Sequence, residues 1–469
     1  MATHNPLRFG YMLRKTPNHI KGCNLITHMD PVDRILLRSS PIENIGPEMG
    51  MMVGRALAMD FKRIVVAKDL MKSSSMMKEA LMSGILSAGS DVIDIGVTTA
   101  PATAMAASLG DCAVYVTEYL GYGMTSGYIL INQDGSQFRI DQLRRLDRVF
   151  LDPPALPGAG ELGRVRRHDL ITEEYNSKLK NVVPKNPGCS VILDCGCGPV
   201  ADSAPQILNA VGAEVLTLNA QNDREYRADE PDEDGLNTTD VKNLVHSNPG
   251  CIGIAMNRIG TMMTVIDEKG MEVTPQETFA IIVQKLKPES IAVPINTTLT
   301  ITDSFKDLWD DAESRIVLTD IDAGSVCNAV ASGADMGFFE GGIIFGDVSM
   351  MPDGIHAAAI ISEIAGNESI NTLTKNLTSC YSDSSSRTCQ CTADSFIRVL
   401  ETCLKNVDGT LHTATDTWRV DMDDGWFLIA IDRGEELSID ISAESRDRAY
   451  LIGLMEIAED LVEECTRGQ

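Results

Sequence analysis

Hydrophobic and polar positions along this chain follow a repeated alternation of helix and strand patterns. In the first cycle, apolar residues at helical spacing alternate with short continuous apolar runs. The helices are expected over 47–61, 73–90 and 101–110, and the strands over 62–69, 91–100 and 112–117. Continuous apolar strands separated by helices are typical of βαβ units, so we predict a parallel sheet with helices on both faces.

The same cycle returns further along the chain, over 189–220, 251–270, 290–320 and 333–366. A Ser-rich stretch over 378–392 is interpreted as a linker. Beyond it, over 393–464, the pattern changes to a helix, several alternating strands and a final amphipathic helix. This order predicts a small α+β module with an antiparallel sheet.

The predicted fold class is therefore α/β, with three consecutive α/β/α domains and a C-terminal α+β domain. A chain of 469 residues is too long for one hydrophobic core, which agrees with several domains. The expected bounds are 1–34 for a basic N-terminal extension, 35–155 for domain I, 165–265 for domain II, 266–375 for domain III and 390–469 for domain IV.

Composition and charge narrow the classes of function. A net charge of -27 argues against nucleic-acid binding, which needs a basic face, and no apolar run reaches the roughly 20 residues of a membrane helix. No secretory signal is recognisable at the N-terminus, so a cytoplasmic location is expected. The basic extension is either a solvated tail or a docking arm for an acidic partner. The 12 cysteines lack zinc-site spacing, and we interpret them as small buried residues.

Several stretches resemble those of the α-D-phosphohexomutases, the phosphoglucomutase and phosphomannomutase family, and they follow one another in the same order as in that family. They are 63–102, 191–208, 252–270, 343–364 and the pair 423–431 and 440–452. The resemblance implies four domains around a sugar-phosphate site made of four loops. In that family a phosphoserine carries the phosphoryl group, three Asp hold Mg²⁺, one loop binds sugar hydroxyls, and an Arg-containing loop clamps the second phosphate.

Each of these four loops departs from the family pattern. Tyr119 stands at the phosphoserine position. Asn257, Ile259 and Thr261 replace the three metal-binding Asp, so no metal site is expected. The sugar loop reads GFFEGG over 337–342, with Glu340 retained.

The phosphate loop departs most in charge. Ala430 stands at the Arg position and Asp432 at the Ser, and Glu435 and Glu436 follow where a phosphate should bind. Glu43 takes the place of an N-terminal Arg of the family. A carboxylate cannot donate the charged hydrogen bonds with which an Arg holds phosphate.

The leading hypothesis is a catalytically inactive phosphohexomutase homologue. It would act as a regulatory or structural subunit, with an active paralogue, another enzyme, a second copy of itself or a sugar phosphate as partner. Four charged residues near the altered loops are candidate ligand contacts, although each could equally be a paired surface charge: Lys68, Arg258, Glu340 and Arg433. The alternative is a diverged hexose-phosphate mutase in which Tyr119 carries the phosphate. Tyr119 could also fill the cleft. No cofactor is predicted, and Mg²⁺ is expected only if the alternative holds.

Overall fold

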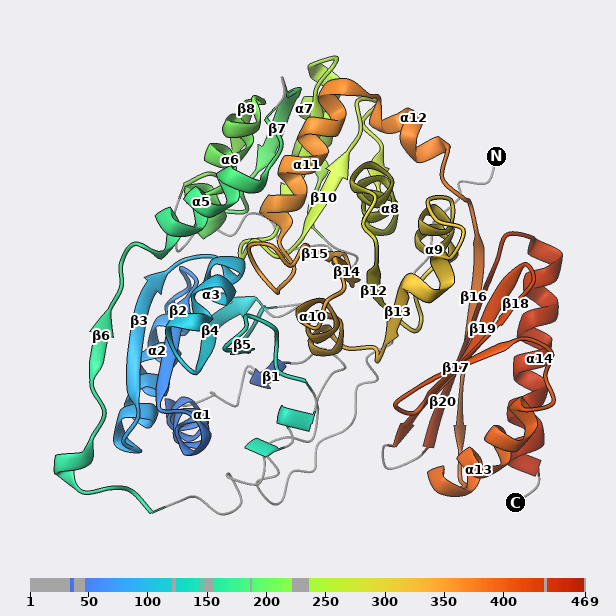
Figure 1. Cartoon of the computed structure of the whole chain (residues 1–469), viewed down its shortest axis with the longest axis horizontal. Helices are drawn as coiled ribbons and strands as arrows, with labels where there is room; N and C mark the ends of the chain where they lie inside the picture. Colours follow the sequence, from blue (N-terminus) through green and yellow to red (C-terminus); the bar gives the residue numbers. More distant parts are fainter. Residues whose placement is uncertain are drawn as a thin grey trace. The chain divides into compact units, whose positions relative to one another are not determined.

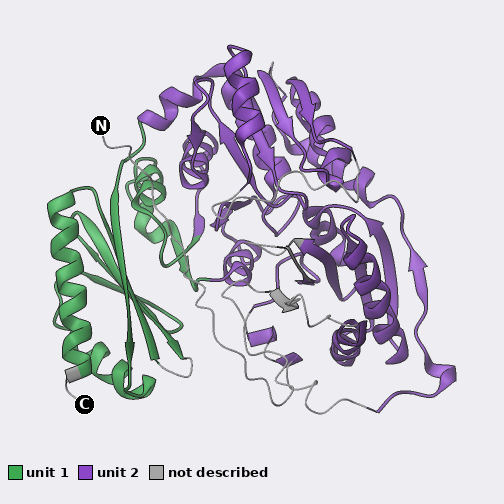
Figure 2. Cartoon of the chain, turned by 180° about the vertical axis from the view of Figure 1, so that it is seen from behind, with its two compact units in different colours: residues 1–15, 293–321, 376–469 green, residues 16–292, 322–375 purple. Residues whose placement is uncertain are grey.

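The structure is a computed structural model that describes residues 34–37, 47–119, 124–139, 141–143, 145–146, 155–185, 188–221, 236–433 and 437–467. The chain divides into two compact units (Figure 2). Unit 1 comprises residues 1–15, 293–321 and 376–469, and unit 2 comprises residues 16–292 and 322–375. The predicted basic extension lies outside the described residues except for Arg34.

The first sheet of unit 2 has six strands, in the order β1 (Arg34–Leu37), β5 (Met124–Asn132), β4 (Cys112–Tyr119), β2 (Arg63–Lys68), β3 (Asp91–Val97) and β6 (Val165–Arg167). Strands β4, β2, β3 and β6 are parallel, and β5 turns back antiparallel to β4. The sheet carries α1 (Pro47–Asp60), α2 (Lys72–Ser87) and α3 (Ala100–Ala106) (Figure 1).

Alternate residues of β2 enter two separate hydrophobic cores. Ile64 and Val66 pack in the core that contains α1 and α2, whereas Val65 and Ala67 pack in the core that contains α3. Successive side chains of a strand point to opposite faces, so both faces of this sheet are covered by helices. The continuous apolar run of β2 and the prediction of a sheet buried on both faces are thus confirmed.

Unit 2 contains two further groups of strands. The second sheet has the order β11 (Glu272–Val273), β10 (Met263–Ile266), β9 (Ile252–Met256), β7 (Ser190–Asp194) and β8 (Glu214–Leu218), with helices α5 (Ile171–Val182), α6 (Ala204–Val211) and α7 (Thr239–Ser247). In the third, Ile291 and Ala292 of β12 (Ile291–Pro294) pair parallel with β14 (Met336–Phe339), which pairs antiparallel with β15 (Gly342–Ile344). Its helices are α8 (Pro275–Leu286), α10 (Ala323–Ala331), α11 (Gly354–Asn367) and α12 (Ile370–Lys375).

Unit 1 is built on a five-stranded antiparallel sheet, in the order β16 (Tyr381–Cys389), β20 (Leu437–Ser445), β19 (Gly425–Arg433), β18 (Thr417–Met422) and β17 (Thr410–Ala414). Helices α13 (Ala393–Leu404) and α14 (Arg448–Arg467) bury their apolar faces against it (Figure 1). The unit also contains α9 (Leu299–Lys306) and β13 (Ile316–Thr319). The predicted α+β module with an antiparallel sheet is confirmed.

The interpretation of 378–392 as a linker is wrong. Residues Tyr381–Cys389 form the edge strand β16, which pairs with β20 along its whole length. The strand has no apolar alternation because its side chains are exposed or only half-buried, and some bind polar groups of α14. The Ser385 hydroxyl donates to Glu459 at 2.9 Å, and Arg387 forms ion pairs with Glu459 and Glu463. A Ser-rich composition is therefore compatible with a strand at this edge.

A buried carboxylate joins the segment 293–321 to the antiparallel sheet of unit 1. Glu444 on β20 accepts hydrogen bonds from the Thr298 hydroxyl (2.6 Å), the Leu299 backbone N–H (2.7 Å) and the Trp426 indole N–H (3.1 Å). The first two are donors at the N-terminus of α9, where backbone N–H groups have no partner within the helix. Glu444 thus caps α9, which explains why 293–321 groups with the C-terminal sheet.

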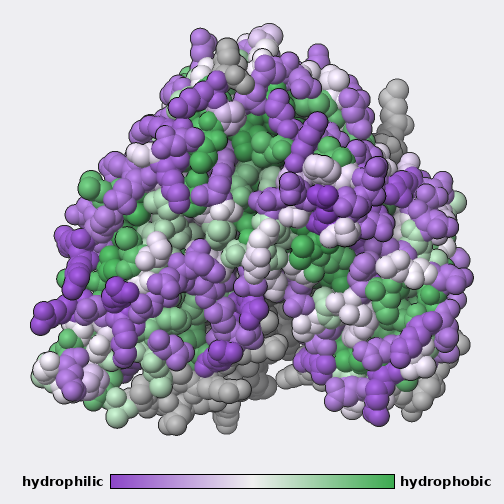
Figure 3. Space-filling view, viewed as in Figure 1, coloured by the Kyte–Doolittle hydropathy of each residue, from purple (hydrophilic) through white to green (hydrophobic). Residues whose placement is uncertain are grey.

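Most of the visible surface in Figure 3 is hydrophilic, with smaller hydrophobic patches between the hydrophilic residues. Among the residues that the structure describes, no helix combines the length and the apolar character that crossing a membrane would require.

Candidate functional site

Four of the positions singled out in the sequence lie at the carboxyl ends of parallel strands in unit 2. Lys68 ends β2, Tyr119 ends β4, Asn257 follows β9, and Glu340 follows β14. In open α/β sheets this edge is where ligands bind. Arg433 is different, because it ends β19 in the antiparallel sheet of unit 1.

The end of β4 is held by Asp69, a buried carboxylate directly after β2. Asp69 Oδ2 accepts from the Thr117 hydroxyl (2.7 Å) and the Glu118 N–H (3.0 Å), and Oδ1 accepts from the Met71 N–H (2.9 Å). This framework positions the backbone of Tyr119, which pairs with Met124. The side chain of Tyr119 and residues 120–123 lie outside the described residues.

The loop after β9, where the resemblance places a metal site, closes on itself. Asn257 Oδ1 accepts from the N–H groups of Thr261 (2.9 Å) and Met262 (3.2 Å), and its Nδ2 donates to the Thr261 hydroxyl (2.8 Å). Mg²⁺ needs oxygen ligands with lone pairs directed at the ion, usually including carboxylates. Here the one amide oxygen is already engaged, so these residues do not fit the family's Mg²⁺. No group of acids, His and Cys suited to a metal is found among the described residues.

Ile259, in the middle of the same loop, is part of the hydrophobic core. Its side chain is 4% exposed and packs in the cluster that contains Ala100 and Ile129. The Ile259 carbonyl accepts from the Ala100 N–H at the start of α3, and the Gly260 carbonyl accepts from the Gly354 N–H at the start of α11, both at 2.9 Å. The loop therefore acts as a joint between elements of three sheets.

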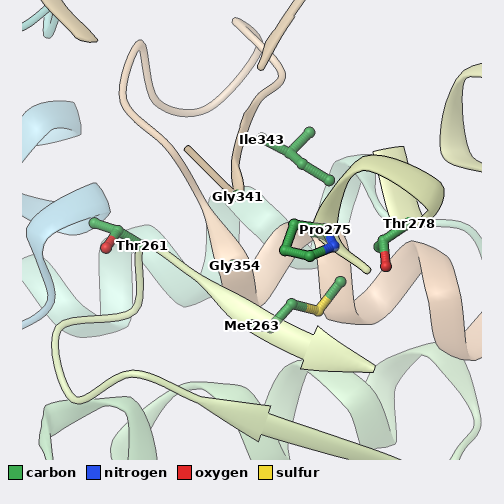
Figure 4. Close-up of a pocket in the computed structure, with 8 residues that line it drawn as sticks. Thr261, Met263, Pro275, Thr278, Gly341, Ile343 and Gly354 are labelled. Carbon is green, nitrogen blue, oxygen red and sulfur yellow. The ribbon is translucent and has the colours of Figure 1, made fainter. Parts of the chain in front are cut away.

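The remaining candidates of unit 2 lie around this joint. The Arg258 guanidinium contacts Met71 Sδ at 2.9 Å, and the Lys68 ammonium donates to the Asp69 carbonyl at 2.9 Å. Glu340 is exposed and has a left-handed backbone with φ 44°. Figure 4 shows a hollow between the loop after β9 and the loop after β14, with α8 and α11 also contributing to its wall. It is lined by Thr261, Met263, Pro275, Thr278, Gly341, Ile343, Gly354 and Ala357. The hollow is small and mostly apolar, and its lining carries no charged side chain for a phosphate.

Arg433 in unit 1 is paired with two carboxylates. Its guanidinium donates to both Asp416 oxygens (2.8 and 2.9 Å) and to Asp394 (3.2 Å). The neighbouring Ala430 and Asp432 offer no donor side chain for a phosphate. Glu43, Glu435 and Glu436 lie outside the described residues. A phosphate at Arg433 would have to compete with two resident anions.

Sequence reasoning missed a buried acid–phenol pair at the start of α11. Both Asp353 oxygens accept from the Tyr175 hydroxyl (2.9 and 2.8 Å), and Oδ1 also accepts from the His356 N–H. Burial raises the pKa of Asp353 to about 7 and lowers the pKa of His356 to about 4. Asp353 before a helix signals an N-cap. No local pattern indicates Tyr175, which lies 178 residues away.

These two shifts make opposite contributions to stability. Between pH 3.8 and about pH 7, Asp353 is deprotonated in the unfolded chain but still protonated in the folded one. This group therefore destabilises the fold as pH rises through that range. Between pH 6.5 and about pH 4, His356 is protonated in the unfolded chain but still neutral in the folded one. This group therefore destabilises the fold as pH falls through that range. Within the shared range the two contributions oppose each other.

Asp353→Asn is expected to expose the contribution of His356. The variant should lose Tm relative to the wild type as pH is lowered from about 7 to about 4.5, by at least ~2 °C. His356→Gln should show the reverse, gaining Tm relative to the wild type over the same change. Scanning calorimetry of all three proteins across pH checks this. Differences in Tm that stay constant with pH would refute the assignment.

Sheets of this order, with loops gathered at the carboxyl ends of parallel strands, define a multidomain α/β protein. Residues 41–151 match the phosphoglucomutase/phosphomannomutase alpha/beta/alpha domain I. A probable phosphoglucosamine mutase of Methanococcoides burtonii is 30% identical over 437 residues, which cover 91% of this chain and 98% of that protein. A phosphoglucomutase/phosphomannomutase of Thermococcus kodakarensis is 25% identical and covers 91% of this chain and 97% of its own.

Solved structures support the same fold. A phosphoglucomutase/phosphomannomutase family protein from Burkholderia thailandensis superposes with a TM-score of 0.74 at 18% identity, covering 93% of this chain and 97% of that one. A putative phosphomannomutase from Thermus thermophilus gives 0.66 at 14% identity, covering 90% and 96%. This chain belongs to the α-D-phosphohexomutase family, and the resemblance seen in the sequence is confirmed.

Proposed function

We propose that this protein is a phosphohexomutase homologue that does not transfer phosphoryl groups and acts instead by binding, as a regulatory or structural subunit. The observation that supports this most is the loop after β9. Its amide closes its own turn, and its central side chain, Ile259, lies in the core. Such a loop stabilises the junction of three sheets and leaves no ligand set for a divalent ion.

The partner we propose is an active mutase paralogue, another enzyme or a second copy of this chain, with a sugar phosphate as the candidate small ligand. Phosphate binding usually relies on Arg or Lys donors that are not already neutralised. At the altered phosphate loop, Arg433 is held by Asp416 and Asp394. This arrangement favours a protein partner over a tightly bound sugar phosphate.

A mutase assay tests this proposal directly. The purified full-length chain is expected to show no conversion of glucose, mannose or glucosamine 1-phosphates to their 6-phosphates with Mg²⁺ and a hexose bisphosphate present. An active mutase run in parallel controls for the assay. Affinity purification from the native host should recover a partner enzyme or a second copy of the chain. Turnover that is abolished by Tyr119→Phe would refute the proposal.

The second candidate is an active, diverged mutase that carries phosphate on Tyr119. Its relatives are named as mutases and match over nearly their whole length. In addition, Asp69 and Thr117 hold the strand end that leads into the loop. Mass spectrometry after incubation with a hexose bisphosphate discriminates the two. Phosphate on Tyr119 would support the mutase, and an unmodified Tyr119 would support the binding protein.

A further inference from the structure

Two cysteines at the end of β16 place their sulfur atoms in direct contact. Cys389 is the last residue of β16 and pairs with Leu437, and Cys391 lies just before α13. Their Sγ atoms are 2.8 Å apart, and the Cys391 N–H donates to Cys389 Sγ at 3.4 Å. A disulfide bond is about 2.05 Å long, so the sulfurs need to approach by less than about 1 Å.

Two more thiols of unit 1 lie close to this pair. Cys403 on α13 hydrogen-bonds to Cys465 on α14, and Cys391 is near enough to affect the ionisation of Cys465. Cys465 is fully buried, whereas Cys389, Cys391 and Cys403 are partly exposed. Among the described residues, no group of His, Cys, Asp and Glu is suited to hold a metal ion.

The chain contains a natural control for the sequence motif. Cys195 and Cys197 have the same C-x-C spacing, but both side chains are at most 1% exposed. The reactivity of a cysteine depends on access to the reagent as well as on formation of the thiolate. The motif alone therefore does not distinguish the two pairs, whereas their exposure does.

We propose that Cys389 and Cys391 form a thiol–disulfide exchange site whose substrates are low-molecular-weight disulfides. One cysteine thiolate attacks a sulfur of the small disulfide, which forms a mixed disulfide and releases one small thiolate. The second cysteine thiolate attacks the protein sulfur of the mixed disulfide, which forms the Cys389–Cys391 bond and releases the second small thiolate. The protein dithiol is oxidised by two electrons, the small disulfide is reduced to two thiols, and the two protons lost by the cysteines pass to them.

The experiment uses the full-length native protein and oxidised glutathione at mildly alkaline pH. Desolvation and the neighbouring Cys389 raise the pKa of Cys391 to about 11, so the thiolate fraction, and with it the rate of oxidation, should increase with pH. Free thiols are then alkylated before digestion with trypsin. Cys389 and Cys391 share the peptide 388–398, whereas Cys403 and Cys465 fall on separate peptides, 399–405 and 449–467.

The expected product is peptide 388–398 lighter by two hydrogens than its reduced form and carrying no alkyl group. In Cys391→Ser, Cys389 should remain as a mixed disulfide with glutathione, because the resolving thiol is missing. Cys195 and Cys197 should stay alkylated in both proteins, and an unchanged Tm confirms that the variant is folded.

Three results would overturn the proposal. One is a peptide 388–398 that keeps two alkylated thiols under conditions that fully oxidise dithiothreitol. Another is a disulfide that joins Cys403 to Cys465 while Cys389 and Cys391 stay reduced. The third is equal oxidation of the pair at Cys195 and Cys197, which would show that the contact at β16 confers no selectivity.

Discussion

Replacing Glu444 by alanine is expected to lower the free energy of unfolding of unit 1 by about 3–5 kcal/mol. The side chain is 3% exposed, and its removal leaves three donors without an acceptor: the Thr298 hydroxyl, the Leu299 N–H and the Trp426 indole. It also removes a carboxylate whose negative charge, like that of Asp421, favours the charged form of the buried Arg419. Burial raises the pKa of Glu444, so part of this stabilisation is already offset by desolvation.

Tryptophan fluorescence measures this effect selectively. All three tryptophans of the chain, Trp309, Trp418 and Trp426, belong to unit 1, so their emission follows the unfolding of that unit in urea. Glu444→Gln keeps one acceptor oxygen and should cost less than half as much. Glu456→Ala, at an exposed position of α14, should change the free energy by no more than about 0.5 kcal/mol. A loss in Glu444→Ala as small as that in Glu456→Ala would contradict the role of Glu444 in capping α9.

Ile259→Asp, which places an acid at a position that the resemblance aligns with a metal ligand of the family, is expected to destabilise unit 2 by at least about 3 kcal/mol. The carboxylate would enter an apolar cluster that contains Ala100 and Ile129. An unpaired buried charge is far more costly than a lost methyl group, so Ile259→Val should cost only about 0.5–1.5 kcal/mol. Calorimetry is the measurement, because no tryptophan lies in unit 2.

The effect of Mg²⁺ on stability tests whether the loop after β9 has a purely structural role or retains the geometry of a metal site. The triple variant Asn257→Asp, Ile259→Asp and Thr261→Asp should unfold at the same temperature with and without millimolar Mg²⁺. A Tm that rises with Mg²⁺ would show that the loop keeps the geometry of a metal site, and it would count against the binding-protein proposal. Binding to the native state alone raises stability in proportion to the logarithm of ligand concentration, so the effect is measurable.

The sequence predicted the sheets of this protein where burial is uniform. β2 reads as a strand because Ile64, Val65, Val66 and Ala67 are all apolar, and they are apolar because helices cover both faces of the sheet. The edge strand β16 was missed because its side chains face solvent or polar groups of α14, which leaves no hydrophobic period to read. The hydrophobic period of a strand arises from the burial of its side chains. A strand whose side chains are not buried therefore shows no such period in the sequence.

The sequence predicted which residues stand at the altered loops, but it did not predict their interactions. The sequence by itself determined that the loop after β9 carries Asn257, Ile259 and Thr261, which the resemblance aligns with the three metal-binding Asp of the family. Only the tertiary structure decided that Ile259 lies in the core, that Tyr175 binds Asp353 and that Glu444 caps α9 across 146 residues. Such contacts depend on how the elements pack in space, and hydrophobic periodicity specifies the face of an element and not its partner.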